Sequence, residues 1–202
     1  MVIYFDTETT GLKPGRVIQL SYIIDDGVTF KGKNFFFAVD YIPIESTMVH
    51  GFTVEKIYTL SGGKTFDDFA DEIYSDFSSA KLIVGHNVMF DIGFLAAEFA
   101  RLGRSFDYEN SLDTMKYFTA VMKLPRKNGS GFKFPKLSET TEFFSLSESD
   151  VAAETKYVFR SGDIGFHDAR YDTTAVMLIF KADAFQGGEL KRIYAEALNG
   201  TS

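Results

Sequence analysis

The chain has 202 residues, 45% of them hydrophobic and 24% charged, a composition that predicts one globular domain with a sizeable core. It contains no cysteine, which excludes disulfides, zinc–thiolate sites and thiol catalysis. The net charge of −7 argues against a protein that coats nucleic acid through a broad basic surface, but it allows an enzyme acting on nucleic acid at an acidic, metal-filled cleft. Because no run of about 18 apolar residues occurs and a strand is predicted from residue 2, we expect a cytoplasmic protein without a signal peptide or a membrane partner.

The first predicted element is a strand. Residues 2–5 are four consecutive apolar residues, typical of a central strand buried on both faces. It runs into Asp6 and Glu8, whose side chains project from the same face because strand side chains alternate. Two like charges held together are costly unless a cation lies between them, and carboxylate oxygens suit magnesium or manganese. Taken alone, the pattern also fits a strand that simply ends in a polar turn.

Two more strands are predicted close behind the first. Residues 16–25 and 33–39 are strand-like, and Asp26-Gly27 between them is a hairpin signal. Three early strands of this kind suggest an antiparallel meander. The lack of a glycine-rich phosphate loop after the first strand argues against a dinucleotide-binding fold.

The middle of the chain alternates helices and short strands. A helical stripe covers residues 65–77, and residues 82–85 form a short apolar strand that leads into an apolar helix at 89–102. A further strand is expected to end at Asp113, where the acid supports the start of a helix to residue 123. Together these elements predict an α/β fold with a mixed sheet of about five strands flanked by helices.

Two further acids fall near helix starts. Asp91 would lie in the first turn of the helix that follows His86-Asn87, where the helix dipole stabilises a carboxylate. Asp172 lies one turn inside a long helix predicted over residues 168–185, with His167 on the loop before it. Asp172 can therefore point along the sheet edge towards the acids of the first strand.

A basic segment separates these two regions. Residues 123–136 contain five basic residues and no acid, with prolines and glycines that break regular structure. Arg126, Lys127 and Lys133 alternate with Phe132 and Phe134, a mixture that can bind single strands by phosphate contact and stacking. A solvated surface insertion is the alternative.

The last predicted helix covers residues 189–198 and is amphipathic. Its apolar residues recur at helical spacing: Leu190, Ile193, Tyr194, Ala197 and Leu198. This stripe either packs back on the domain or forms an interface with a twin subunit or a polymerase-type partner.

Three motifs in order resemble those of the DEDD exonuclease superfamily, in its DEDDh branch. They are Asp6-x-Glu8-Thr9-x-Gly11-Leu12, His86-Asn87-x3-Asp91 and His167-x-Ala169-x2-Asp172. The segments 85–87 and 90–94 are similar to those of proofreading epsilon subunits of bacterial DNA polymerase III. The resemblance implies a ribonuclease H-like exonuclease domain over residues 1–186, with residues 187–202 forming a C-terminal helix of the same unit or an interface.

The resemblance also implies a mechanism. Two divalent ions, Mg²⁺ or Mn²⁺, would be held by Asp6, Glu8, Asp91 and Asp172, with His167 as the general base. The reaction would be 3′-to-5′ hydrolysis of nucleic acid that releases nucleoside 5′-monophosphates. The substrate-binding candidates implied by family membership are Thr7, Thr9, Leu12, His50, Asn87 and Phe90. For Phe90, packing in the helix core is an equal alternative.

Several functional alternatives stay open at this point. Single-stranded or frayed DNA 3′ ends are the preferred substrate. Discrimination against RNA depends on the geometry of the nucleotide pocket, which the sequence does not give. An exoribonuclease acting on RNA or short oligoribonucleotides is therefore the alternative. A catalytically silent nucleic-acid-binding module is disfavoured because five catalytic positions are intact. The protein could also act as a homodimer or as an accessory subunit of a polymerase-type partner.

Overall fold

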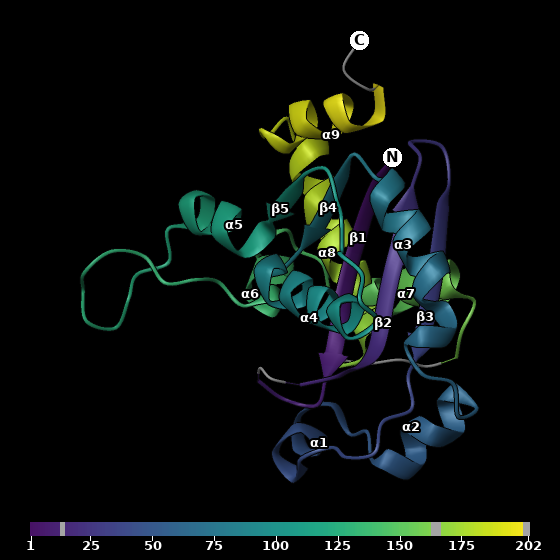
Figure 1. The fold of residues 1–202 in the computed structure, drawn as a ribbon. Helices are drawn as coiled ribbons and strands as arrows, with labels where there is room; N and C mark the ends of the chain where they lie inside the picture. Colours follow the sequence, from purple (N-terminus) through teal and green to yellow (C-terminus); the bar gives the residue numbers. More distant parts are fainter. Residues whose placement is uncertain (13–14, 163–166, 200–202) are drawn as a thin grey trace.

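The sheet is the centre of the molecule. The structure, a computed structural model, describes residues 1–12, 15–162 and 167–199. Five strands lie in the order β3-β2-β1-β4-β5 (Figure 1). They are β1 (Val2–Thr9), β2 (Val17–Asp25), β3 (Phe30–Phe36), β4 (Leu82–Gly85) and β5 (Ser111–Asp113). The first three pair antiparallel, whereas β4 and β5 run parallel to β1, which confirms the predicted mixed sheet.

Helices cover both faces of this sheet. The hydrophobic core on one face is built with α3 and α4, and the core on the other face with α5 and α7 to α9 (Figure 1). None of the helices within the described ranges is both long and apolar enough to cross a membrane. The helices are α1 (Ile44–His50), α2 (Val54–Ser61), α3 (Ala70–Ser79), α4 (Val88–Arg101), α5 (Thr114–Met122), α6 (Leu137–Phe143), α7 (Glu148–Phe159), α8 (Ala169–Phe185) and α9 (Leu190–Asn199).

The side chains of β1 point alternately into the hydrophobic cores on the two faces of the sheet. Ile3 and Phe5 are buried with α3 and α4, whereas Val2 and Tyr4 are buried with α8. Successive side chains of a strand point to opposite faces, so the even-numbered Asp6 continues the α8 side. The register of this one strand therefore decides which helix its acids face.

The third strand differs from its predicted position. It begins at Phe30 and ends at Phe36, three residues earlier than the 33–39 expected. Asp26 accepts hydrogen bonds from the N–H groups of Val28 and Thr29, at 2.8 and 2.7 Å, and this turn starts the pairing at once. Phe37 lies beyond the strand in the core, 5.1 Å from the Phe66 ring.

Two helices, α2 and α7, were not predicted, and the helix expected at 65–77 is divided. Residues Asp67–Phe69 form a 3₁₀ turn before α3 begins. Helix α7 starts with a capping box in which Ser147 and Asp150 exchange hydrogen bonds. Such local hydrogen bonds can start a helix whose apolar residues do not recur clearly at helical spacing. A prediction from the spacing of apolar residues therefore does not find α7.

The C-terminal helix packs on the domain. Leu190 is fully buried, and the terminal ammonium of Met1 donates to the carbonyl of Ala197 at 2.9 Å. Tyr194 donates to Asp25 Oδ1 at 3.0 Å, and Lys181 of α8 pairs with the other oxygen at 2.8 Å. These contacts hold α9 against α8 and the start of the sheet.

Candidate active site

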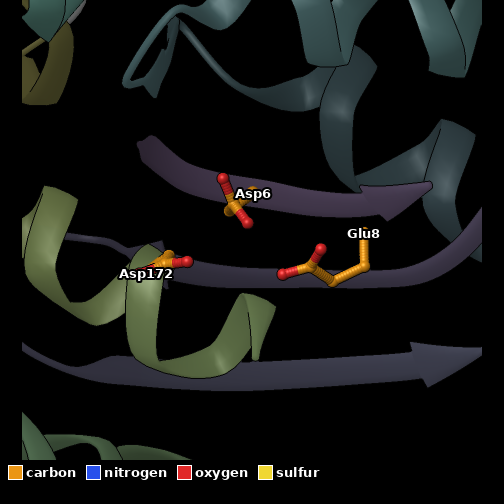
Figure 2. A group of neighbouring side chains, drawn as sticks. All are labelled: Asp6, Glu8 and Asp172. Atoms are coloured by element: carbon orange, nitrogen blue, oxygen red, sulfur yellow. The ribbon is translucent and has the colours of Figure 1, made fainter. Parts of the chain in front are cut away.

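Three carboxylates converge at the end of β1. Asp6, Glu8 and Asp172 each offer an oxygen, and these oxygens lie within 4.8 Å of one another. Figure 2 shows the two β1 acids pointing towards Asp172 on α8. The even register of β1 explains the meeting, because it turns both strand acids to the face that α8 covers.

A polar network anchors the start of α8. The side chain of Gln19, fully buried in β2, donates to Asp168 Oδ1 at 2.9 Å and accepts from the N–H of Ala169 at 3.2 Å. Asp168 is the N-cap of α8 and pairs with Arg170 at 2.6 Å. Thr173 adds a hydrogen bond to the carbonyl of Ser21 at 3.1 Å. These bonds fix the first turn of α8, and therefore Asp172, against the sheet.

Asp91 is not one of the three acids whose oxygens lie within 4.8 Å of one another. It is buried in the first turn of α4 and accepts a 2.6 Å hydrogen bond from Thr7 Oγ1. Thr7 has the odd register of β1 and faces α4, so this bond follows from the same alternation. After burial, the charge of Asp91 contributes most to the raised pKa of Asp6.

Burial dominates the electrostatics of all four acids. It raises the pKa of Asp6 well above its ordinary value, with neighbouring carboxylates adding to the effect. Burial likewise raises the pKa of Glu8 to about 9, helped by the charges of Asp172 and Asp168. The pKa values of Asp91 and Asp172 are raised to about 7, again chiefly by burial. Without a cation, these groups therefore hold protons near neutral pH.

The donor set fits a hard divalent metal. All the converging ligand atoms are carboxylate oxygens, which Mg²⁺ and Mn²⁺ prefer over soft metals. A divalent ion would also offset the cost of burying these negative charges, which is the main cause of the raised pKa values. Asp6, Glu8 and Asp172 could therefore hold a metal, with Asp91 beside them.

His167 lies at the rim of a cavity next to this group. The cavity has a volume of ≈ 470 Å³ and is lined by Asp6, Asp172, His86, Lys136 and His167, among others. The His167 side chain is exposed, on a residue with a left-handed φ of 60° directly before the N-cap of α8. The predicted base therefore lines the same cavity as two of the carboxylates.

A second cavity of ≈ 400 Å³ gathers most predicted substrate contacts. Its lining includes Thr7, Thr9, Leu12, His50 and Phe90, together with Glu8. Leu12 is 83% exposed, so its side chain projects at the mouth. His50 is buried, and its Nε2 has no hydrogen-bond partner among the described residues, while Nδ1 accepts from the N–H of Phe52 at 3.1 Å.

Asn87 does not line either of the two cavities. It is exposed at the start of α4 with a φ of 73°, and its N–H donates to Asp113 Oδ1 at 3.0 Å. Asp113 also accepts from the N–H groups of Met115 and Lys116, which confirms it as the N-cap of α5. The link between Asn87 and Asp113 thus joins two helix starts.

Sequence reasoning missed two residues that build the site. Gln19 positions α8, and the available signal was a polar residue inside the apolar run of residues 17–20. Lys136 lines the same cavity as Asp6, whereas the sequence marked it only as the last residue of the basic segment, with no role at the carboxylates. Gln19 acts through hydrogen bonds to residues about 150 positions later in the sequence.

The chain belongs to the exonuclease family, because residues 3–180 match the model of that family. This confirms the resemblance to the DEDD exonuclease superfamily. Curated relatives include the DNA polymerase III subunit epsilon of Rickettsia conorii, 33% identical over 123 residues, which are 56% of this chain and 52% of the relative. The subunit epsilon of Buchnera aphidicola is 30% identical over 57% of this chain and 54% of its own length. This chain therefore spans about half the length of those relatives.

Solved structures share the fold. E. coli exonuclease I in complex with a dA16 oligonucleotide superposes with a TM-score of 0.73 at 20% identity, over 96% of this chain and 43% of that one. A product-bound exonuclease I gives a TM-score of 0.71 at the same identity, over 96% of this chain and 46% of that one. These matches confirm the predicted ribonuclease H-like exonuclease fold.

Proposed function

We propose that this chain is a metal-dependent 3′-to-5′ exonuclease that hydrolyses single-stranded or frayed DNA 3′ ends to nucleoside 5′-monophosphates. The observation that carries the proposal is the group of Asp6, Glu8 and Asp172 between two cavities. One cavity contains the residues predicted to seat a terminal nucleotide, and the other contains His167. A scissile phosphate at the carboxylates would reach both.

Two Mg²⁺ or Mn²⁺ ions are proposed as the cofactors, held by the three converging acids with Asp91 in support. When bound, such ions supply a more acidic water and neutralise charge on the attacking and leaving oxygens. Thr7 orients Asp91 through its 2.6 Å hydrogen bond, and Gln19 holds the helix that carries Asp172.

His167 is proposed as the general base. An imidazole ring nitrogen of His167 accepts a proton from water as the water oxygen bonds to phosphorus. The bond between phosphorus and the 3′ oxygen of the preceding nucleotide breaks, and that oxygen takes a proton from solvent to become a 3′ hydroxyl. The terminal nucleoside leaves as its 5′-monophosphate. The exposed, solvent-facing position of His167 leaves its ring free to approach this water.

The terminal nucleotide is proposed to occupy the cavity lined by Thr9, Leu12, His50 and Phe90. The exposed Leu12 side chain can pack against the last bases, and the unpartnered Nε2 of His50 can make a hydrogen bond to a polar group of the nucleotide. Asn87 would contact the strand only outside this cavity.

The names of the relatives support DNA as the substrate. The curated relatives are named as DNA polymerase III subunits, and the solved exonuclease I structures contain dT13 or dA16 oligonucleotides. The same names support a polymerase-type partner for this chain. RNA is the substrate to test against DNA, because both carry the same phosphodiester.

The test uses 5′-labelled oligo(dT) and oligo(U) of equal length, with Mg²⁺ and with EDTA. We expect DNA to shorten stepwise from its 3′ end, mononucleotides to appear, and EDTA to stop the reaction. Asp6→Ala serves as the matched inactive control. Faster shortening of oligo(U) would reassign the substrate to RNA, and no cleavage of either strand by the wild type would contradict the proposed activity.

A further inference from the structure

The basic segment between α5 and α6 forms a hairpin. Pro125 and Phe132 make an antiparallel bridge, and the N–H of Lys133 donates to the carbonyl of Leu124 at 2.9 Å. Arg126 stabilises the turn, since its Nε donates a hydrogen bond to the carbonyl of Phe132 at 2.8 Å. Figure 1 shows this segment extending far from the body of the domain. An arm of this shape contributes almost nothing to the core.

The base of the hairpin is attached to the active-site cavity. His86 Nε2 lies 3.0 Å from the carbonyl oxygen of Pro135, and its Nδ1 lies 3.0 Å from Thr114 Oγ1. The next residue, Lys136, lines the cavity that contains Asp6 and Asp172. A strand leaving the carboxylates through this cavity would therefore run onto the hairpin.

The charge of the hairpin contrasts with that of the chain. Residues 123–136 have five basic residues and no acid, in a protein of net charge −7. Lys133 pairs with Glu139, whose charge also interacts with that of Lys136. Lys123 and Lys127 are exposed and make no ion pair with any residue that the structure describes. Phe132 and Phe134 are 44% and 55% exposed, although aromatic rings of this size are usually covered.

We propose that the hairpin of residues 123–136 binds the single-stranded substrate on the 5′ side of the scissile phosphate. Its lysines contact backbone phosphates, and its exposed phenylalanines stack on bases, as in proteins that track single strands. The proposal rests on the proposed exonuclease function and adds a second binding site outside the nucleotide pocket. It also explains how an acidic protein can hold a polyanion.

The test compares two doubly neutralised variants. Lys123→Gln/Lys127→Gln removes hairpin charge without touching Arg126, and Lys31→Gln/Lys191→Gln removes the same charge from β3 and α9, away from the active site. Each is assayed on an oligo(dT) of about 12 nucleotides, within the about 4 to 16 nucleotides typical of one single-strand site. The second substrate is the p-nitrophenyl ester of thymidine 5′-monophosphate, a diester too short to reach the hairpin.

We expect the hairpin variant to have a ratio of kcat/KM, long substrate over short substrate, that is lower by about 5-fold or more. The loss should appear as a higher KM for the long substrate, because two phosphate contacts are lost. The plot of log kcat/KM against log salt concentration should be less steep by about 1.4, at about 0.7 per phosphate contact on a single strand. Phe134→Ala should lower the same ratio about 5-fold or more without changing the salt slope.

An unchanged ratio and salt slope in the hairpin variant, equal to those of the Lys31/Lys191 control, would overturn the proposal. An equal loss on both substrates would also overturn it, since the hairpin would then act on the active site and not on the strand. If the wild type hydrolyses neither substrate, the proposed function itself fails, and the hairpin site fails with it.

Discussion

At the scale of single residues, the site is a set of acids that the fold forces together. Asp6, Glu8 and Asp172 bring their oxygens within 4.8 Å, and burial keeps their pKa values raised. Such an arrangement is unfavourable for the folded chain alone and favourable for a divalent cation. The predictions at this scale follow from this difference between the metal-free and the metal-bound protein.

Asp172→Ala should abolish hydrolysis and leave the fold intact. In EDTA, its melting temperature should be higher than that of the wild type, because one of the mutually repelling buried acids is gone. Asp6→Ala should behave in the same way. The measurements are oligonucleotide hydrolysis and thermal melting with and without Mg²⁺, and retention of more than a few per cent of wild-type activity would contradict the metal-site assignment.

His167→Ala should lose about 10²- to 10⁴-fold in kcat, the usual contribution of a positioned base. With Mg²⁺ saturating at every pH, the wild-type rate should rise with pH, and this rise should be weaker in the variant. Metal affinity, measured by calorimetry, should fall far less than in Asp6→Ala. A variant with the wild-type rate and pH profile would remove His167 from the mechanism.

At the scale of elements, β1 and α8 build the site and α9 supports them. The alternation of β1 turns Asp6 and Glu8 to α8, and Gln19 of β2 holds the start of that helix. Helix α9 covers the opposite end of the same core, where Leu190 is fully buried and Tyr194 binds Asp25. The stability of α8 thus depends partly on a helix far from the chemistry.

Leu190→Ala should lower the free energy of unfolding by about 2–5 kcal/mol, the range for a buried leucine. The neighbouring exposed Lys191→Ala should change it by less than about 0.5 kcal/mol. Denaturant unfolding measures the effects of these two substitutions.

Deleting residues 187–202 should lower the free energy of unfolding further but leave hydrolysis of short oligonucleotides at moderate temperature. Light scattering on the truncated chain adds a check, because a change from dimer to monomer would assign α9 to an interface.

At the scale of the whole molecule, the acidic site couples stability to pH and metal. The pKa values of Asp91 and Asp172 rise from 3.8 to about 7, and that of Glu8 rises from 4.5 to about 9. Between the ordinary and the raised values, the folded chain holds protons that the unfolded chain has released. The free energy of unfolding then decreases as pH increases.

In EDTA, the melting temperature should therefore decrease as the pH is raised from about 5 to about 9, over the window that these raised pKa values define. Mg²⁺ should stabilise the protein more at pH 8 than at pH 5.5, because binding must displace the protons. The matched control is Asp172→Asn, whose profile should be flatter. A wild-type melting temperature that increases steadily with pH in EDTA would contradict the raised pKa values.

The sequence by itself determined the elements and the motifs. A run of apolar residues ended by Asp6 and Glu8 specified a buried strand with two acids on one face, because alternation is a local property of any strand. The same local logic predicted β4, the start of α4 just before Asp91 and the start of α8 before Asp172. It failed at β3 and α7, where turn and cap hydrogen bonds set the boundaries.

Only the tertiary structure decided how these elements meet. It joined Asp91 of α4 to Thr7 of β1 by a hydrogen bond, and it brought Gln19 to the N-terminus of α8, 149 residues away from its partner Asp168. It also placed Lys136 in the lining of the same cavity as Asp6 and packed α9 on the domain. Periodicity describes which face of one element is apolar. The partner of that face depends on packing between elements distant in the chain, which no local pattern contains.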